Sequence, residues 1–395
     1  VFHMTTYTPD FSIRTAVRKV LPYMMEMREY FHARPELSGK EFDTCKTIFR
    51  ELTLTGVADV KIIAGTGITG IIHGALPGPT VLVRAATDAL PLEETDDSPY
   101  ASIFPGVMHA AGHDGHTATL LGLAKLLTTH ADCLRGNVRL AFEPESETRG
   151  GAEKMIDSAV LTNPPVDYAL NIQIDGTLAG GEIGFCNGTI FASRDDFTIT
   201  VNGTGGHCTQ VAPQDDAIRK GLSLIGKISD YVATLQKQNT AALISFGRFN
   251  GGNTTAVIPA RVEIKGTLRT FDDDIRRDIL AELEELCRTD CTWEHCFVAP
   301  VGKNDTAITA ACEEIWQTYC TDRFTVIKTS PDFRSDDFAR FGEHMPIFSC
   351  FVGVHEGIPL RPYSSSFIWD SSMLKYTCEA TAALIYYLPS YGRNL

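Results

Sequence analysis

The chain has 395 residues, of which 44% are hydrophobic and 21% are charged, as in ordinary globular proteins. Its formal net charge is -14, from 49 acidic and 35 basic residues, which argues against nucleic acid or an anionic membrane as a partner. No run approaches the roughly 20 apolar residues of a membrane span. The length predicts two domains, and no signal peptide is visible. We expect Met4 to be the natural start, after three residues left from expression.

Helices and strands are expected to alternate along the first half of the chain. Residues 11–56 carry apolar side chains at three- and four-residue spacing, and three strand segments separated by Gly and Pro turns follow within residues 60–86. A helix is expected over 116–131, a buried strand over 137–145 and another helix over 151–161. This alternation predicts an α/β sheet that is covered by helices.

The pattern changes after residue 187. Alternating strands surround two helical segments, 214–238 and 272–289, in the order β-α-β-β-α-β, which is typical of a two-layer sandwich. From about residue 303 the helix and strand alternation resumes and ends in an amphipathic helix. We therefore predict a discontinuous α/β catalytic-type domain over residues 4–187 and 303–395, with an α+β domain inserted at 188–302.

The eleven cysteines are odd in number and mostly scattered, which fits reduced thiols in the cytoplasm better than a disulfide framework. One cluster brings Cys287, Cys291, His295 and Cys296 close together in the sequence. Thiolate and imidazole are ligands of zinc, but this spacing matches no closed zinc motif. We interpret the cluster as partly buried free thiols where a helix end leads into a strand.

Six motifs occur in order along the chain: HARPELSGKEFDT, VLVRAATDALPLEE, GVMHAAGHDGHTATLLGLAKLL, VRLAFEPESETRGGAEKMI, GTGGHCTQVAP and RSDDFARF. Together they resemble the amidohydrolase branch of the M20 family of metallopeptidases, which includes aminoacylases, hippurate hydrolases and auxin-conjugate hydrolases. The match covers nearly the whole chain. It implies an α/β catalytic domain with an inserted lid and dimerisation domain, and hence a homodimer formed through the inserted domain.

The resemblance also implies a pair of divalent metal ions, with a glutamate as the general base that deprotonates a metal-bound water. Carried onto this sequence, the five ligand positions are Ala111, His113, Glu147, Gln173 and Tyr363, and the base position is Ser146. The first aspartate of the second motif is replaced by Ala86, whereas Asp88 remains. Three of the five ligands and the base are thus replaced, so we expect neither a metal pair nor another cofactor. A single weakly bound ion at His113 and Glu147 is the alternative.

Several side chains at these positions could still carry out acid-base chemistry. Without metal, Glu147 is expected to have a raised pKa unless an Arg or His pairs with it, and His113 titrates in a useful range. Tyr363 could donate to an oxyanion. His207 matches the family histidine that reaches the substrate carbonyl from the lid of the partner subunit. Ser146 is either a nucleophile or, as we favour, a small polar filler.

Three side chains are candidates for binding the substrate. Gln173 occupies a former ligand position, and Arg269 is an arginine that the family keeps. Arg334 stands where the family has glycine. It could bind a substrate carboxylate or form a surface ion pair.

Three hypotheses follow. The first is an enzyme of biosynthesis that performs metal-independent isomerisation, cyclisation, condensation or acyl transfer on a small acyl, amide or amino-acid-like molecule. The second is a non-catalytic pseudo-hydrolase that binds a ligand or serves as a scaffold. The third is a residual amidohydrolase with a single metal ion.

Overall fold

The computed structural model describes residues 9–148, 150–320 and 322–391, so the expected start at Met4 lies outside the described residues. The chain divides into two compact units. The larger unit consists of Val1–Ile190, Lys303–Ser330 and Asp337–Leu395. The inserted unit consists of Phe191–Gly302 together with Pro331–Asp336. The short second segment lies outside the insertion that we predicted at 188–302.

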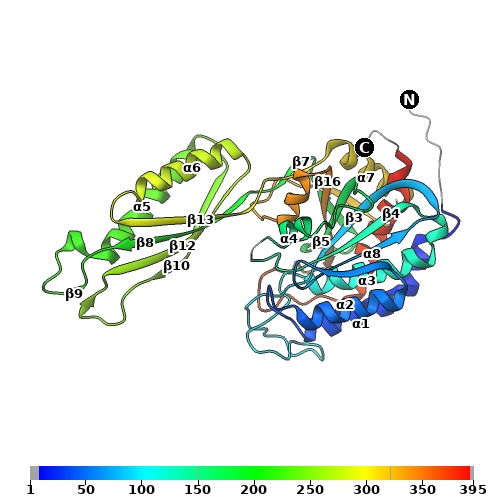
Figure 1. Ribbon diagram of the computed structural model, residues 1–395, viewed down its shortest axis with the longest axis horizontal. Helices are drawn as coiled ribbons and strands as arrows, with labels where there is room; N and C mark the ends of the chain where they lie inside the picture. Colours follow the sequence, from blue (N-terminus) through cyan, green and yellow to red (C-terminus); the bar gives the residue numbers. More distant parts are fainter. Residues whose placement is uncertain (1–8, 149, 321, 392–395) are drawn as a thin grey trace. The chain divides into compact units, whose positions relative to one another are not determined.

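The larger unit is built on an eight-stranded sheet in the order β1-β2-β4-β3-β5-β16-β6-β15. Its strands β3, β4, β5 and β16 are labelled in Figure 1. The strands are β1 (Ala58–Ile63), β2 (Gly67–His73), β3 (Leu76–Ala86), β4 (Arg135–Glu143), β5 (Tyr168–Ala179), β6 (Glu182–Phe185), β15 (Thr325–Lys328) and β16 (Ile347–His355). The four central strands β4, β3, β5 and β16 run parallel to one another. Their carboxyl ends therefore meet at one edge of the sheet, where ligands bind in folds of this kind.

Both faces of this sheet are covered by helices. The helices are α1 (Ile13–Ala33), α2 (Phe42–Thr55), α3 (His113–Thr129), α4 (Gly151–Asp157), α7 (Thr306–Tyr319) and α8 (Leu374–Tyr387). Along β3, Val81 and Val83 join the core cluster that includes α1, α3 and α8, whereas Leu82 joins a second cluster that includes α4. This alternation is that of a strand buried on both faces.

The helical pattern that we predicted across residues 11–56 is interrupted, because α1 ends before Arg34 and α2 begins at Phe42. Arg34 precedes Pro35, and a residue before proline is disfavoured in the helical conformation. The predicted helix over 151–161 is also shorter, since α4 ends at Asp157. The first difference leaves a connecting segment that contains Ser38, whose hydroxyl donates to Asp88.

The inserted unit contains a four-stranded antiparallel sheet in the order β10-β12-β8-β13. Its elements in chain order are β8 (Arg194–Asn202), β9 (Gly206–His207), α5 (Ala217–Lys237), β10 (Ala242–Asn250), β11 (Val257–Ile258), β12 (Arg261–Thr270), α6 (Asp273–Leu286) and β13 (Cys291–Ala299). Asp216 and Asp272 cap α5 and α6 by accepting backbone N–H groups. The short strands β9 and β11 form a separate ribbon, as do β7 (Gly188–Phe191) and β14 (Gly302–Asn304).

The mixed α/β fold that we predicted is confirmed. Within the described part of the chain, no helix has both the length and the apolar character needed to cross a membrane. The cysteine cluster lies where α6 leads into β13, as predicted: Cys287 caps the helix and Cys291 begins the strand. All eleven cysteines are free thiols.

Candidate active site

The carboxyl ends of the parallel strands bring the candidate residues of the larger unit together. Asp88 follows the end of β3 by two residues, and Ser146 and Glu147 lie in the turn after β4. Tyr363 lies in the loop that follows β16. His113 is the first residue of α3. Residues that are far apart in the sequence therefore form one cluster, because successive strands of a parallel sheet end at the same edge.

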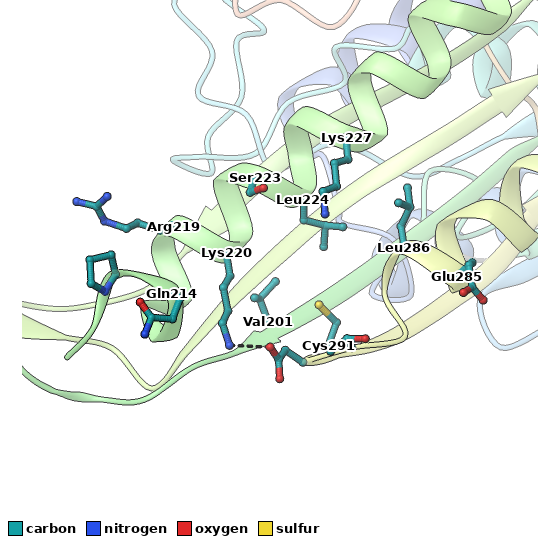
Figure 2. A pocket seen from close by; sticks show the side chains of 13 residues that line it. Val201, Gln214, Arg219, Lys220, Ser223, Leu224, Lys227, Glu285, Leu286 and Cys291 are labelled. Atoms are coloured by element: carbon teal, nitrogen blue, oxygen red, sulfur yellow. Dashed lines mark hydrogen bonds and ion pairs between the residues drawn. The ribbon is translucent and has the colours of Figure 1, made fainter.

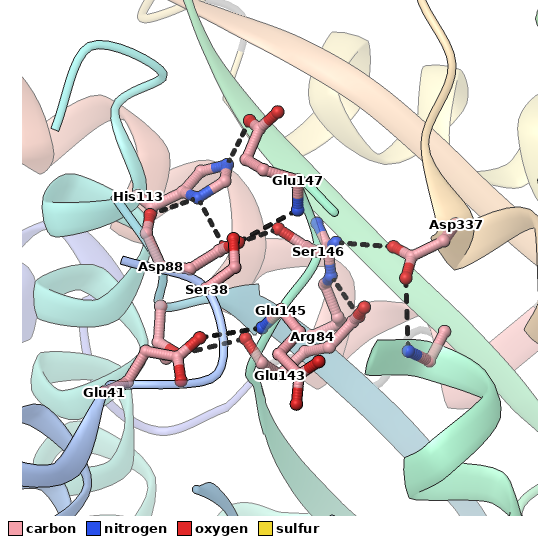
Figure 3. Close-up of polar contacts among 12 residues, drawn as sticks. Ser38, Glu41, Arg84, Asp88, His113, Glu143, Glu145, Ser146, Glu147 and Asp337 are labelled. Carbon is pink, nitrogen blue, oxygen red and sulfur yellow. Dashed lines mark hydrogen bonds and ion pairs between the residues drawn. The ribbon is translucent and has the colours of Figure 1, made fainter. Parts of the chain in front are cut away.

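Asp88 is the buried centre of this cluster, and its carboxylate accepts four hydrogen bonds (Figure 3). Oδ1 accepts from Ser146 Oγ at 2.7 Å and from His113 Nδ1 at 3.1 Å. Oδ2 accepts from Ser38 Oγ at 2.7 Å and from the Glu147 N–H at 2.9 Å. Burial raises the pKa of Asp88, but these bonds and the charge of His113 outweigh it and hold that pKa well below its usual range. Asp88 is therefore a permanent anion.

His113 joins Asp88 to Glu147. Its Nδ1 lies 2.8 Å from the carbonyl oxygen of Asp88 as well as contacting the carboxylate, and its Nε2 lies 3.6 Å from Glu147 Oε1. Burial lowers the pKa of His113, but the hydrogen bond to Asp88 and the charges of Asp88 and Glu147 raise it to about 9. The ring is therefore an imidazolium at neutral pH, with Nδ1–H directed at Asp88 and Nε2–H on the side of Glu147.

Glu147 has a second partner, because the hydroxyl of Tyr363 donates to its Oε1 at 2.8 Å. Glu147 is thus paired with both a histidine and a tyrosine hydroxyl. Tyr363 has φ of +59°, an uncommon conformation for a bulky side chain, and such strain often occurs at functional sites. Its backbone N–H donates to the Ala110 carbonyl at 2.8 Å, and 56% of the residue is exposed. Two hydrogen bonds therefore hold Tyr363 over the cluster.

Ser146 is oriented away from nucleophilic chemistry. Its hydroxyl donates to Asp88, while both nitrogens of His113 have other partners, Asp88 and Glu147. A serine nucleophile needs a base that accepts its proton in a reactive geometry. Ser146 therefore bonds to Asp88 and not to His113, and both roles considered for it stay predictions.

The start of α3 lies very close to β5. A Cβ on Gly115 would lie 2.5 Å from Ile174 Cδ1 and 2.7 Å from Trp369 Cζ2, so any larger residue would displace one of these side chains. Next to it, His116 Nε2 accepts the backbone N–H of Ile174 at 2.9 Å. Burial keeps the pKa of His116 well below its ordinary value, so the ring stays a neutral acceptor. These contacts fix the position of Gln173, the neighbour of Ile174 in β5, relative to α3.

The profile of a protein family described as peptidase family M20/M25/M40 matches residues 82–378. The chain belongs to the M20 family of peptidases. It is 32% identical over 386 residues to thermostable carboxypeptidase 2 of Saccharolobus solfataricus, covering 94% of this chain and 97% of that protein. It is 34% identical to N-acetyl-L-cysteine deacetylase of Bacillus subtilis, covering 84% and 80%. A solved dinuclear metal binding peptidase of the M20 family from Bacillus subtilis has a TM-score of 0.76 at 27% identity, covering 94% and 99%. The predicted family is confirmed.

The positions that the resemblance assigns to metal ligands carry few metal-binding groups in this M20 chain. The positions that the resemblance assigns to three ligands and the base carry a methyl group, an amide, a phenol and a hydroxyl, in Ala111, Gln173, Tyr363 and Ser146. Among the residues that the structure describes, no group of three or more His, Cys, Asp and Glu side chains is placed to share an ion. Zinc and related metals require several imidazole, thiolate or carboxylate ligands.

The other three candidates belong to the inserted unit. His207 is exposed in β9, with Nδ1 2.9 Å from Thr209 Oγ1. Arg269 Nη1 donates to the Phe333 carbonyl at 3.1 Å and to a serine hydroxyl in the same segment, so Arg269 braces Pro331–Asp336. Arg334 Nε pairs with Asp332 Oδ2 at 2.7 Å. The structure shows this ion pair, and binding of a substrate carboxylate by Arg334 stays a prediction.

A hollow of about 660 Å³ lies in the inserted unit between α5 and the turn that joins α6 to β13 (Figure 2). Leu224 and Lys227 of α5 line it, and the ammonium group of Lys220 is paired with Asp290 at 2.7 Å. None of the candidate catalytic or substrate-binding residues lines this hollow. It is therefore separate from the cluster around Asp88.

Sequence reasoning missed two residues that support the cluster. Ser38 donates to Asp88. It lies in the first of the six motifs, and this position could have marked it as a candidate site residue. Arg84 is buried, with Nε 2.6 Å from Glu143 Oε2 and Nη2 3.3 Å from Asp337 Oδ1 (Figure 3). It joins the ends of β3 and β4 to the RSDDF motif. No local sequence pattern predicts this contact, because Arg84, Glu143 and Asp337 are far apart in the sequence.

Proposed function

We propose that this M20 chain catalyses acid-base chemistry that needs no metal pair, on a small acyl, amide or amino-acid-like molecule. The reaction classes are isomerisation, cyclisation, condensation and acyl transfer. The observation that carries the proposal is the continuous row Asp88–His113–Glu147–Tyr363. Three of its members, His113, Glu147 and Tyr363, occupy positions at which the resemblance implies metal ligands.

The row divides the chemistry among its members. Asp88 fixes the tautomer and orientation of His113 and stabilises its charged form, so Nε2–H is the general acid. Glu147 is the general base, since its carboxylate lies on the solvent side of the imidazolium. The Tyr363 hydroxyl, which donates to Glu147 in the free protein, can donate to an oxyanion that develops at the same place. General acid-base catalysis of this kind contributes roughly 10²- to 10⁴-fold in rate.

A second candidate function is amide hydrolysis, and the relatives favour it. Their names are those of a carboxypeptidase and an N-acetyl-L-cysteine deacetylase, both of which break amide bonds. In this chain His113 and Glu147 would be the ligands left for a single ion. A non-catalytic homologue that only binds a ligand is the third possibility.

We also propose a cytoplasmic homodimer that forms through the inserted unit, with His207 acting in the site of the partner. Three large apolar side chains of that unit are exposed: Leu222 in α5 (57%), Phe249 in β10 (39%) and Val257 in β11 (48%). Exposed apolar groups on neighbouring elements are typical of surfaces that associate.

Elemental analysis and rescue of the metal site test the proposal together. Protein purified without chelator should hold much less than one metal ion per chain, and added manganese or zinc should not change its turnover of acyl and amide substrates. The fourfold variant A111C, S146E, Q173H and Y363H restores the implied ligands and base, and should bind about two ions per chain. A stoichiometry near one ion in the unaltered protein, with hydrolysis that depends on that ion, would contradict the proposal and establish the second candidate.

A further inference from the structure

Arg361 lies in the loop between β16 and α8, two residues before Tyr363. The backbone around it is fixed at several points. The Leu360 N–H donates to the Gly176 carbonyl at 2.7 Å, and the Arg361 carbonyl accepts from Ser364 Oγ at 2.7 Å. A Cβ on Gly176 would lie 2.7 Å from the Leu360 carbonyl oxygen, so the loop packs directly on β5. Arg361 therefore projects from a well-anchored backbone.

This loop places Arg361 beside the catalytic row. Tyr363 bonds to the Ala110 carbonyl through its N–H and to Glu147 through its hydroxyl. Two residues of extended chain span at most about 7 Å, so the Cα of Arg361 lies within that distance of the Cα of Tyr363. Leu360, which precedes Arg361, bonds to Gly176 of β5, and Gly176 follows Gln173 by three residues in that strand. Arg361 thus lies between the strand of Gln173 and the contact of Tyr363 with Glu147.

The side chain of Arg361 is exposed, and within the described part of the chain its guanidinium has no hydrogen-bond or ion-pair partner. Other arginines that adjoin the candidate residues are engaged by protein groups: Arg84 by Glu143 and Asp337, Arg269 by Phe333 and Ser335, and Arg334 by Asp332. The two arginines predicted to bind substrate are among them. Arg361 is therefore a free cation next to a row that contains two carboxylates.

A substrate with an anionic group needs a positive counter-charge here, since Asp88 and Glu147 repel it. The planar guanidinium presents paired donors that match a carboxylate, and it remains charged at every accessible pH. We propose that Arg361 anchors the carboxylate of the substrate beside Tyr363 and Glu147. The inference rests on the proposed function, because it concerns the same site and the same class of small acyl and amide molecules.

The experiment compares two probes that differ only in the carboxylate, N-acetylglycine and N-acetylglycinamide, by calorimetric titration at low ionic strength. A hydrogen-bonded charge pair predicts that the unaltered protein binds the acid about tenfold more tightly than the amide. R361Q should reduce this preference to within about twofold, and R361K should keep part of it as a point charge. The control R18Q removes an exposed arginine of α1 and should leave the preference intact.

The outcomes separate this inference from the proposed function. Equal affinity for the two probes in the unaltered protein, or an unchanged preference in R361Q, overturns the anchor. Added salt should reduce the preference in the unaltered protein and in R18Q. A preference that depends on Arg361, together with turnover that E147Q leaves unchanged, supports the anchor and contradicts the acid-base function. Loss of turnover in E147Q with an unchanged preference in R361Q supports the function alone.

Discussion

Two polar clusters lie on either side of the first turn of α3, and they begin at adjacent residues. His113 belongs to the row with Asp88, Glu147 and Tyr363, which reaches solvent. Asp114 instead faces the interior, where its Oδ2 accepts from Arg28 Nε at 2.9 Å and lies 2.8 Å from a histidine nitrogen. The cluster of His113 is therefore accessible to a substrate, whereas the cluster of Asp114, the next residue of the helix, is not.

The interior cluster is balanced and enclosed. His32 bridges Asp114 and Glu94 through its two nitrogens, at 2.8 and 2.9 Å. The guanidinium of Arg28 lies 4.2 Å from the ring centroid of Trp369 and donates to the carbonyl of that residue. Two cations and two anions sum to zero charge there, whereas the open row has two carboxylates and one imidazolium. The difference suggests that the interior cluster holds the fold and that the surplus carboxylate of the open row serves as a base.

The largest effect should come from the open row. E147Q removes the proposed base and should lower turnover by about 10²- to 10⁴-fold, because the amide cannot accept the proton. The free energy of unfolding should change by less than about 1 kcal/mol, since glutamine has nearly the same shape and its amide oxygen can still accept from Tyr363. Steady-state kinetics and denaturant titration measure the two quantities. E153Q, at an exposed glutamate of α4, is the control. Full turnover in E147Q would remove Glu147 from the mechanism.

The interior cluster should show the opposite response. R28M keeps most of the side-chain volume but leaves Asp114 as a buried charge without its guanidinium partner, which costs about 3–5 kcal/mol of unfolding free energy. R18M, on the exposed side of the same helix, should change that free energy by less than about 0.5 kcal/mol. If R28M unfolds at the same denaturant concentration as R18M, the interior cluster does not hold the fold.

The pH dependence of stability should also report on the interior cluster. Burial lowers the pKa of His32, but its bonds to Asp114 and Glu94 outweigh this and raise the pKa to about 8. The folded state therefore holds a proton that the unfolded state releases near pH 6.5. This contribution is complete below pH 6.5 and is lost as the pH rises through 8, which removes about 2 kcal/mol of stability.

Denaturant titrations at pH 6.5 and 9 measure this loss. H32Q should flatten the change between the two values, whereas H73Q, at an exposed histidine, should leave it unaltered. A difference between pH 6.5 and 9 that persists in H32Q would assign it to other groups.

The smallest effect should come from Y363F, which removes the hydroxyl that donates to Glu147. One hydrogen bond to a charged group is worth about 1.5–3 kcal/mol, and exposure of Tyr363 places the effect near the lower end, about tenfold in turnover. The pH profile of turnover should shift, because Glu147 loses a donor to its charged form. An unchanged profile would mean that the phenol contributes packing alone.

The sequence carried enough information to predict the family, the mixed α/β fold and the closeness of Asp88, His113 and Glu147. The resemblance to the M20 family implied this closeness, because it assigns the motifs that contain these residues to one site. The contact of Tyr363 with Glu147 could not be predicted, because it depends on a left-handed residue in a long loop. The bond of Arg28 to Asp114 spans 86 residues, and no local pattern reports such a pairing.

The close packing at Gly115 and His116 has a consequence for how such proteins are recognised. Both residues of the HDGH motif are held by α3 and β5 themselves, through a steric limit and a backbone hydrogen bond that involve no metal. Both residues therefore have a structural role that does not depend on a bound metal. The HDGH motif by itself therefore does not report whether a chain binds metal. Under the proposed function, the side chains at positions 111, 146, 173 and 363 are the ones that carry this information.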